Sequence, residues 1–157
     1  MALTKVQPEM MQQLTASIMP TGSVIQTVQG VSTTSLGTTS TSFVTTGLSV
    51  SITPIATTSK VLVTATFIGS PSTSTVYGFF TLYRGSTNLA VNSATPYFSD
   101  VSYLNNYDGT VTVTYLDSPA TTSSTTYTIY FKSSNGAIVY IGDGNSTSTI
   151  TAMEIHG

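Results

Sequence analysis

The sequence predicts an all-β protein, an antiparallel β-sandwich or jelly roll that follows a short N-terminal arm. Apolar and polar residues alternate with a period of two from about residue 23 to the end. Ser and Thr make up about a third of the chain, and Thr, Val, Tyr and Phe suit a pleated, half-buried surface. Turn residues separate the alternating runs. About nine or ten strands of ordinary length result, which is typical of two packed sheets.

Three of these runs predict which side chains face the core. In each run, alternate residues are apolar or aromatic and share one face, while the residues between them face the other way. The predicted core faces are Val61, Val63, Ala65 and Phe67; Val111, Val113 and Tyr115; and Tyr127, Ile129 and Phe131.

The turn residues predict how the strands connect. Asn135-Gly136 favours a tight hairpin, because this pair takes positive φ angles readily. We expect Asp143-Gly144-Asn145 to turn the next strand back, and Arg84-Gly85-Ser86 to end another. Gly47 indicates either a hairpin or one kinked strand, which Pro54 then ends.

The first 22 residues differ from the rest and form the predicted arm, with the sandwich over 23–157. Between Pro8 and Pro20, four apolar side chains have spacings that fit a short helix, and the alternative is an apolar arm on a neighbouring surface; the four are Met10, Met11, Leu14 and Ile18. Such a segment is too short to fold alone, and methionine adapts to irregular grooves. We therefore expect it to anchor the protein to a partner through Met10, Met11, Leu14, Ile18 and Met19.

The composition excludes several classes of protein. Only 6% of the 157 residues are charged, against roughly a quarter in ordinary domains. Four Lys and Arg residues and a net charge of −2 provide no basic face for nucleic acid. No apolar run approaches the roughly 20 residues of a membrane-spanning helix, and no h-region of a signal peptide is present. The absence of cysteine excludes disulfides and thiolate nucleophiles.

Residues for catalysis are scarce. The single histidine, His156, is next to last, where we expect a solvent-exposed tail residue rather than a member of a triad. Most of the six acidic residues are expected at turns or strand ends, and no phosphate loop or nucleophile motif is present. We therefore predict no catalytic residue, no cofactor and no metal site. The acidic residues are Glu9, Asp100, Asp108, Asp117, Asp143 and Glu154.

One stretch, residues 96–109, offers oxygen donors of the kind that calcium takes, but it lacks the spacing of an EF-hand loop. Its donors are Asp100, Asn105, Asn106 and Asp108. The same stretch is rich in aromatic residues, which could form a loop that binds sugars or could cap one end of the sandwich. These residues are Tyr97, Phe98, Tyr103 and Tyr107.

Several segments, in their order, resemble tail-appendage proteins of tailed bacteriophages, those of cyanophages especially. Each segment alone consists mostly of strand and turn residues, but together they span nearly the whole chain. They are residues 1–6 (MALTKV), 22–26 (GSVIQ), 46–48 (TGL) running into 52–54 (ITP), 59–63 (SKVLV), 82–85 (LYRG) and 149–155 (TITAMEI).

This resemblance implies a trimeric jelly-roll knob on the outer surface of a virion, which cell lysis would release without a signal peptide. Fibre proteins that this sequence resembles usually carry a long shaft or a dedicated attachment domain before the knob, whereas an arm of about 20 residues is too short for a shaft. We therefore expect a capsid decoration (cement) protein that contacts the major capsid protein. The alternative is a receptor-binding tip or short tail-fibre appendage that binds host surface glycans; a free-standing lectin ranks third and an enzyme last.

Overall fold

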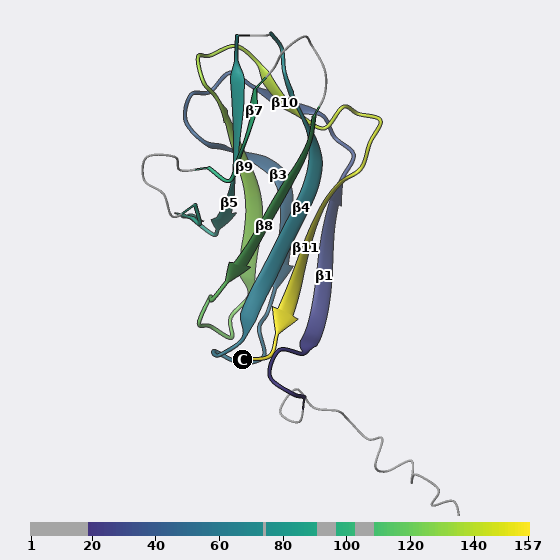
Figure 1. Ribbon diagram of the computed structural model, residues 1–157, viewed down its shortest axis with the longest axis vertical. Coiled ribbons are helices and arrows are strands. Elements are labelled where there is room, and N and C mark those ends of the chain that lie inside the picture. The colour runs from purple at the N-terminus through teal and green to yellow at the C-terminus, as the bar shows by residue number, and fades with distance from the viewer. Residues whose placement is uncertain (1–18, 74, 91–96, 103–108) are drawn as a thin grey trace, which may run out of the picture.

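A computed structural model describes residues 19–73, 75–90, 97–102 and 109–157, in which the chain forms two packed antiparallel sheets and no helix (Figure 1). The predicted all-β, two-sheet architecture is therefore confirmed. Sheet A contains β1 (Val24–Ser32), β2 (Leu36–Thr38), β4 (Lys60–Pro71), β8 (Gly109–Asp117), β10 (Val139–Ile141) and β11 (Ser148–Ile155). Sheet B contains β3 (Val44–Ile52), β5 (Tyr77–Arg84), β6 (Thr87–Asn88), β7 (Ser99–Ser102) and β9 (Thr125–Ser133).

The long strand β4 organises sheet A. Along one edge it pairs with β8, and along the other it pairs first with β11 and then with β10. Because both β10 and β11 are antiparallel to β4, they run in the same direction, end to end. The prediction that Asp143-Gly144-Asn145 turns the chain back is therefore wrong: this loop joins two collinear segments.

Sheet B is built around β9 and β5, with β3 on one side and the short strands β6 and β7 on the other. The β3 strand is one kinked strand, in which the pairing register shifts between Thr45 and Ser49. Gly47 lies inside this shift at φ +78°, a backbone conformation that favours glycine. Of the two alternatives for Gly47, the kinked strand is correct.

The Asn135-Gly136 turn has the predicted positive φ, +89° at Gly136, but it is not a hairpin. It connects β9 in sheet B to β10 in sheet A, so the chain crosses from one sheet to the other. A turn residue determines the local change of direction, whereas the sheet that the next strand joins depends on where its apolar face can be buried. Arg84-Gly85-Ser86 does end β5, and Arg84 pairs with Thr87 across it.

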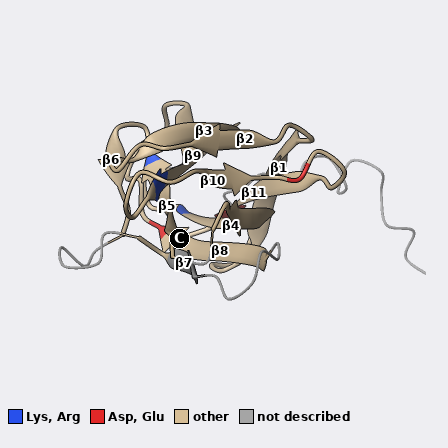
Figure 2. Ribbon diagram, turned by 90° about the horizontal axis from the view of Figure 1, so that it is seen from above, with Lys and Arg blue, Asp and Glu red and all other residues tan. Residues whose placement is uncertain are grey.

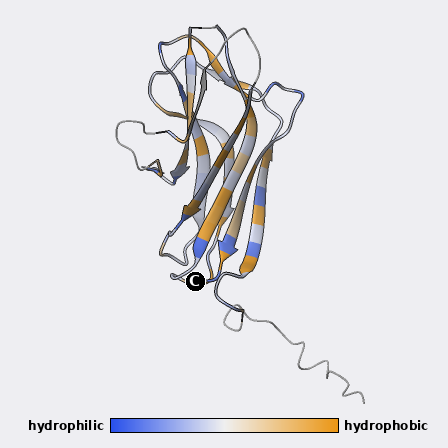
Figure 3. Cartoon of the chain, in the orientation of Figure 1, coloured by the Kyte–Doolittle hydropathy of each residue, from blue (hydrophilic) through white to orange (hydrophobic). Residues whose placement is uncertain are grey.

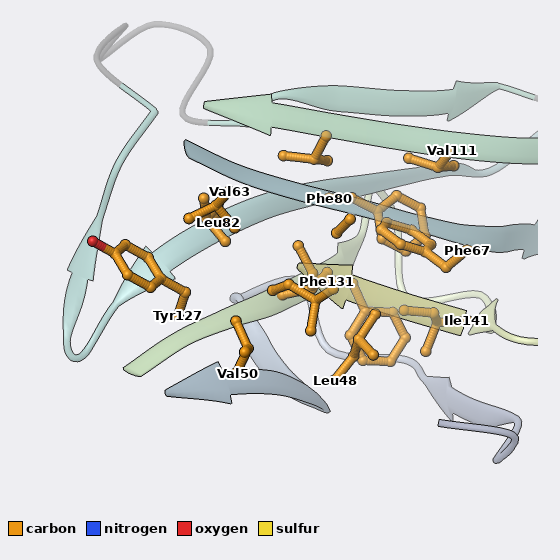
Figure 4. Close-up of a cluster of buried hydrophobic side chains, with 14 of the residues drawn as sticks. Leu48, Val50, Val63, Phe67, Phe80, Leu82, Val111, Tyr127, Phe131 and Ile141 are labelled. Atoms are coloured by element: carbon orange, nitrogen blue, oxygen red, sulfur yellow. The ribbon is translucent and has the colours of Figure 1, made fainter. Parts of the chain in front are cut away.

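The core consists of the inward-facing residues of both sheets, and the predicted faces of β4 and β9 are entirely buried (Figure 4). Val111 and Val113 are also buried, and Tyr115 packs against the same cluster. The ring of Phe80 lies 5.0 Å from Phe67 in sheet A and 6.1 Å from Phe131 in its own sheet. Burial of each large apolar side chain contributes about 1.5–3 kcal/mol before ordering costs.

A charged cluster joins the two sheets near the end of β8. Nη1 of Arg84 lies 2.9 Å from each carboxylate oxygen of Asp117, and the Tyr127 hydroxyl donates to Oδ2 of Asp117 over 2.7 Å. Asp117 is only 4% exposed, so both partners replace water around a buried charge. Burial, and then the contact with Asp117, raise the pKa of Tyr127 far above its ordinary value. The hydroxyl therefore stays protonated and remains a donor.

We predict that Tyr127→Phe lowers the free energy of unfolding by about 1–3 kcal/mol, because Asp117 loses a hydrogen bond that water cannot replace. Urea denaturation measures this change. Tyr130→Phe is the matched control on the outer face of the same strand, and it should change stability by less than about 0.5 kcal/mol. Equal effects of the two substitutions would contradict the structural role of the buried hydroxyl.

Candidate functional site

The outer face of sheet B carries a group of aromatic side chains that the core does not use. Because Phe80 and Leu82 of β5 point inward, Phe79 and Tyr83, which flank them, point outward. On β9, the inward Ile129 and Phe131 likewise place Tyr130 outward. We call this surface the aromatic face; it consists of Phe43, Tyr77, Phe79, Tyr83, Tyr97, Tyr130 and Lys132.

The rings of the aromatic face hold one another in place. Tyr83 and Tyr130 are stacked across neighbouring strands, with ring centroids 4.1 Å apart. The centroid of Phe79 lies 4.6 Å from that of Tyr97 and 6.4 Å from that of Tyr77. Such ring pairs contribute a favourable free energy in addition to that of burying their apolar area. The rings are thus fixed in position while their outer surfaces stay partly exposed, and Tyr77 is 47% exposed.

Lys132 places one positive charge among these rings. Its Nζ lies 4.9 Å from the ring centroid of Phe43 and 5.3 Å from that of Phe79. Both rings attract the ammonium group through their π-systems. In the described part of the chain, where charged residues are few (Figure 2), the only ion pair joins Arg84 and Asp117. Lys132 therefore has no carboxylate partner among the described residues.

Hydroxyl groups border the rings. On the side of β3, the exposed Thr45 pairs with Tyr130 and shares its face, and its Oγ1 accepts a hydrogen bond from the amide of Gly47 over 3.1 Å. Between Phe79 and Tyr83 on β5, Thr81 is buried and donates to Oδ1 of Asn88 over 2.6 Å. The face thus combines flat apolar rings, hydroxyl and amide groups and one cation, which is a set suited to binding and contains no nucleophile paired with a base.

The predicted aromatic loop is divided by the structure. Tyr97 joins the aromatic face, whereas Phe98 turns toward the core, where its ring lies 5.3 Å from that of Tyr115. The binding interpretation therefore fits Tyr97 and the capping interpretation fits Phe98. Tyr103 and Tyr107 lie outside the described residues.

Only the end of the predicted arm is described: Met19 is half-buried, while Met10, Met11, Leu14 and Ile18 lie outside the described residues. The chain enters the sandwich beside its C-terminus (Figure 1). There the amide of Gly22 donates to the carbonyl of His156 over 2.7 Å, and the amide of His156 donates to the carbonyl of Ser23 over 2.9 Å. The prediction of an exposed His156 is wrong, because this pairing half-buries the residue and leaves its Nδ1 buried without a partner.

The remaining candidates are the acidic and amide side chains that could bind a metal ion, and those that the structure describes do not form a metal site. No group of three or more His, Asp or Glu residues gathers among the described residues, and Asn105, Asn106 and Asp108 lie outside them. Oδ1 of Asp143 accepts bonds from the Ser146 hydroxyl and from two backbone amides, as expected of a turn aspartate, and these bonds lower its pKa. None of the described segments forms a helix long and apolar enough to cross a membrane.

No protein-family model matches this chain. No curated protein matches it either. The interpretation of the aromatic face therefore rests on its own geometry and chemistry.

Sequence reasoning missed most of the aromatic face, although the signal was present. The run TVYGFFTLYR has aromatic residues at both parities, so an inward Phe80 implies outward Phe79 and Tyr83. Likewise, the prediction that Tyr127, Ile129 and Phe131 share the core face implies outward neighbours in that strand. The two adjacent strands β5 and β9 therefore present rings on one outer face, which the predicted loop at residues 96–109 did not include.

Glu154 is the next-to-last residue of β11, in keeping with the expectation that most acidic residues lie at turns or strand ends, but it is fully buried. It binds the amide of Ile55 through Oε1 at 2.7 Å and the side chain of Gln26 through Oε2. Burial by itself would raise the pKa of Glu154, but hydrogen bonds, the one from Gln26 foremost, outweigh it and hold the pKa below its ordinary value. Glu154 thereby ties β11 to β1 and to the loop after β3.

A lowered pKa in the folded state means that acid removes stability. We predict that the free energy of unfolding falls as the pH drops below about 4.5, the ordinary pKa of a Glu side chain, because the unfolded chain takes up the proton more readily. Glu154→Gln should be less stable than the wild type near neutral pH, and the difference should shrink in acid. Thermal unfolding from about pH 7 to 3 measures both trends. A difference that does not depend on pH would contradict this role. Thr151→Ser, an uncharged substitution on the same strand, is the control, and its effect on stability should be the same at every pH.

Proposed function

We propose that this protein is a non-enzymatic structural protein of a phage virion, a trimeric decoration (cement) protein on the outer surface that stabilises the head. Its sequence resemblance to phage appendage proteins motivates this assignment. The observation that carries it further is the position of the arm: backbone bonds of Gly22 and Ser23 to His156 hold the start of the sandwich at one end of the body. We propose that residues 1–22, which join the sandwich at that end, attach it to the capsid.

We further propose that the sandwich is a jelly roll. When the short strands β2, β6 and β10 are left out, the strand orders of the two sheets are β1-β11-β4-β8 and β3-β9-β5-β7. Successive strands of this set alternate between the sheets, except that β5 and β7 lie in one sheet. Eight strands in two such sheets are typical of a jelly roll with two Greek keys, which supports the assignment.

The outer face of sheet A supports a homotrimer. Two rows of neutral side chains cross its four strands in register: Gln29, Thr151, Thr64 and Thr114, and Val31, Thr149, Thr66 and Thr112. Some of these groups already bind one another, as Gln29 does with Thr151 over 3.2 Å. Val31 and Leu116 at the edges are 64% and 46% exposed, and hydrophobic colour recurs along β1 in Figure 3. Among the described residues, Lys60, at the start of β4, is the one charged residue that shares this face, and the two rows can be buried against another copy without desolvating a charge.

We predict that Thr112→Lys dissociates the trimer, since it places an ammonium group within this neutral face. Light scattering at micromolar concentration measures the mass. The matched control is Thr126→Lys, an exposed threonine that likewise contacts a hydroxyl on the neighbouring strand of sheet B. A Thr112→Lys protein that keeps the trimeric mass would exclude this face as the subunit contact.

Deletion of residues 1–20 tests the decoration function directly. The truncated protein should remain folded, since every described strand begins after this segment, but it should no longer sediment with undecorated heads. Three arms per trimer add avidity, so the loss should be large. Equal sedimentation of the truncated and full-length proteins would show that the body makes the attachment.

The second candidate is a receptor-binding tip or short tail-fibre appendage that attaches to host surface glycans. The aromatic face is the observation that favours it, because exposed groups of aromatic residues mark interaction sites. Full-length protein that binds host cells and fails to bind heads would select this candidate.

A further inference from the structure

We propose that the aromatic face is a saccharide-binding site that prefers glycans with acidic sugars, and that Lys132 binds the sugar carboxylate. This inference goes beyond the decoration function, and it holds wherever on the particle the protein sits. It depends on three properties of the described residues: rings that are held in place and partly exposed, a hydroxyl group beside them, and one cation fixed among them.

The first property is that these rings lie on the outer face of sheet B and are not part of the hydrophobic core. The core closes on the other side of sheet B around Phe80 and Phe131. An outer face of an antiparallel sheet is ordinarily polar, yet here six aromatic side chains occupy it. Tyr77 is 47% exposed and the other five rings are half-buried, and a group of partly exposed rings in this place favours a binding site.

The second property distinguishes a sugar from a purely apolar partner. A sugar ring presents C–H groups on its faces and hydroxyl groups around its edge. Tyr77, Phe79 and Tyr97 offer ring surfaces to the former. Thr45, which is exposed and pairs with Tyr130 on the same face, offers a hydroxyl group to the latter. Because the rings already pack against one another, binding would cost little side-chain entropy.

The third property is charge complementarity. Lys132 is the only charged side chain of the aromatic face, and its Nζ is held between Phe43 and Phe79 at 4.9 and 5.3 Å. The described residues supply no carboxylate to it. An acidic sugar stacked on the neighbouring rings would bring its carboxylate within reach of this ammonium group, and partial shielding from water would strengthen the pair.

The test is titration of the full-length protein with two defined probes, tetragalacturonate as the acidic saccharide and cellotetraose as the neutral one, followed by calorimetry. The wild type should bind the acidic probe more tightly. Lys132→Gln should weaken binding of the acidic probe by about fivefold or more and leave the neutral probe unchanged. Tyr77→Ala removes an exposed ring and should weaken binding of both probes by a similar factor.

Two matched controls lie on sheet A. Lys60→Gln makes the same change of charge at an exposed position, and Tyr140→Ala removes a ring that is 37% exposed. Neither should alter binding.

The proposal is overturned if the wild type binds neither probe at about 10 mM, a weak limit even for single sugars. Equal losses in the controls would also overturn it, as would a lower oligomeric mass of Tyr77→Ala, which would make the aromatic face a subunit contact. The titration uses the free protein and tests only saccharide binding. The decoration function is tested separately, by sedimentation with undecorated heads.

Discussion

The packing of Phe67, Phe80 and Phe131 between the sheets is the interaction on which the rest of this structure depends. Phe80 contacts rings from both sheets, so its position sets the register of β5 against β9 and of sheet B against sheet A. In a strand, a slip of one residue moves every side chain to the opposite face. Once Phe80 is inside, Phe79 and Tyr83 must lie outside, and the aromatic face follows from the core.

The scarcity of charge makes each charged residue informative. Asp117 and Glu154 are buried, and each is surrounded by donors from other strands or loops. They connect elements that hydrophobic packing alone would leave loosely joined, at the cost of desolvation that their hydrogen bonds offset. Lys132 is different, because its neighbours are rings rather than carboxylates. A cation without an acidic partner among the described residues is better suited to a ligand than to the fold.

The two outer faces of the sandwich differ in a way that suits two kinds of contact. Sheet A presents rows of threonine with exposed aliphatic residues at its edges, a neutral surface that a second copy could cover. Sheet B presents rings and a single cation. A virion surface protein that packs with its own copies and also contacts glycans would need two such surfaces, with the arm at one end for attachment.

The sequence by itself determined the all-β class, the two-sheet architecture and the core faces of β4, β8 and β9, because alternation with a period of two is a local property of the chain. It also determined that Asp143 accepts the hydrogen bonds of a local turn and that a strand ends at Arg84. Only the tertiary structure decided which strands pair, so the hairpin predicted at Asn135-Gly136 became a crossing between sheets. The same holds for the aromatic face and for the buried Glu154: each depends on side chains from distant segments meeting in space, and strand pairing between distant segments is fixed by the packing of the whole domain rather than by neighbouring residues.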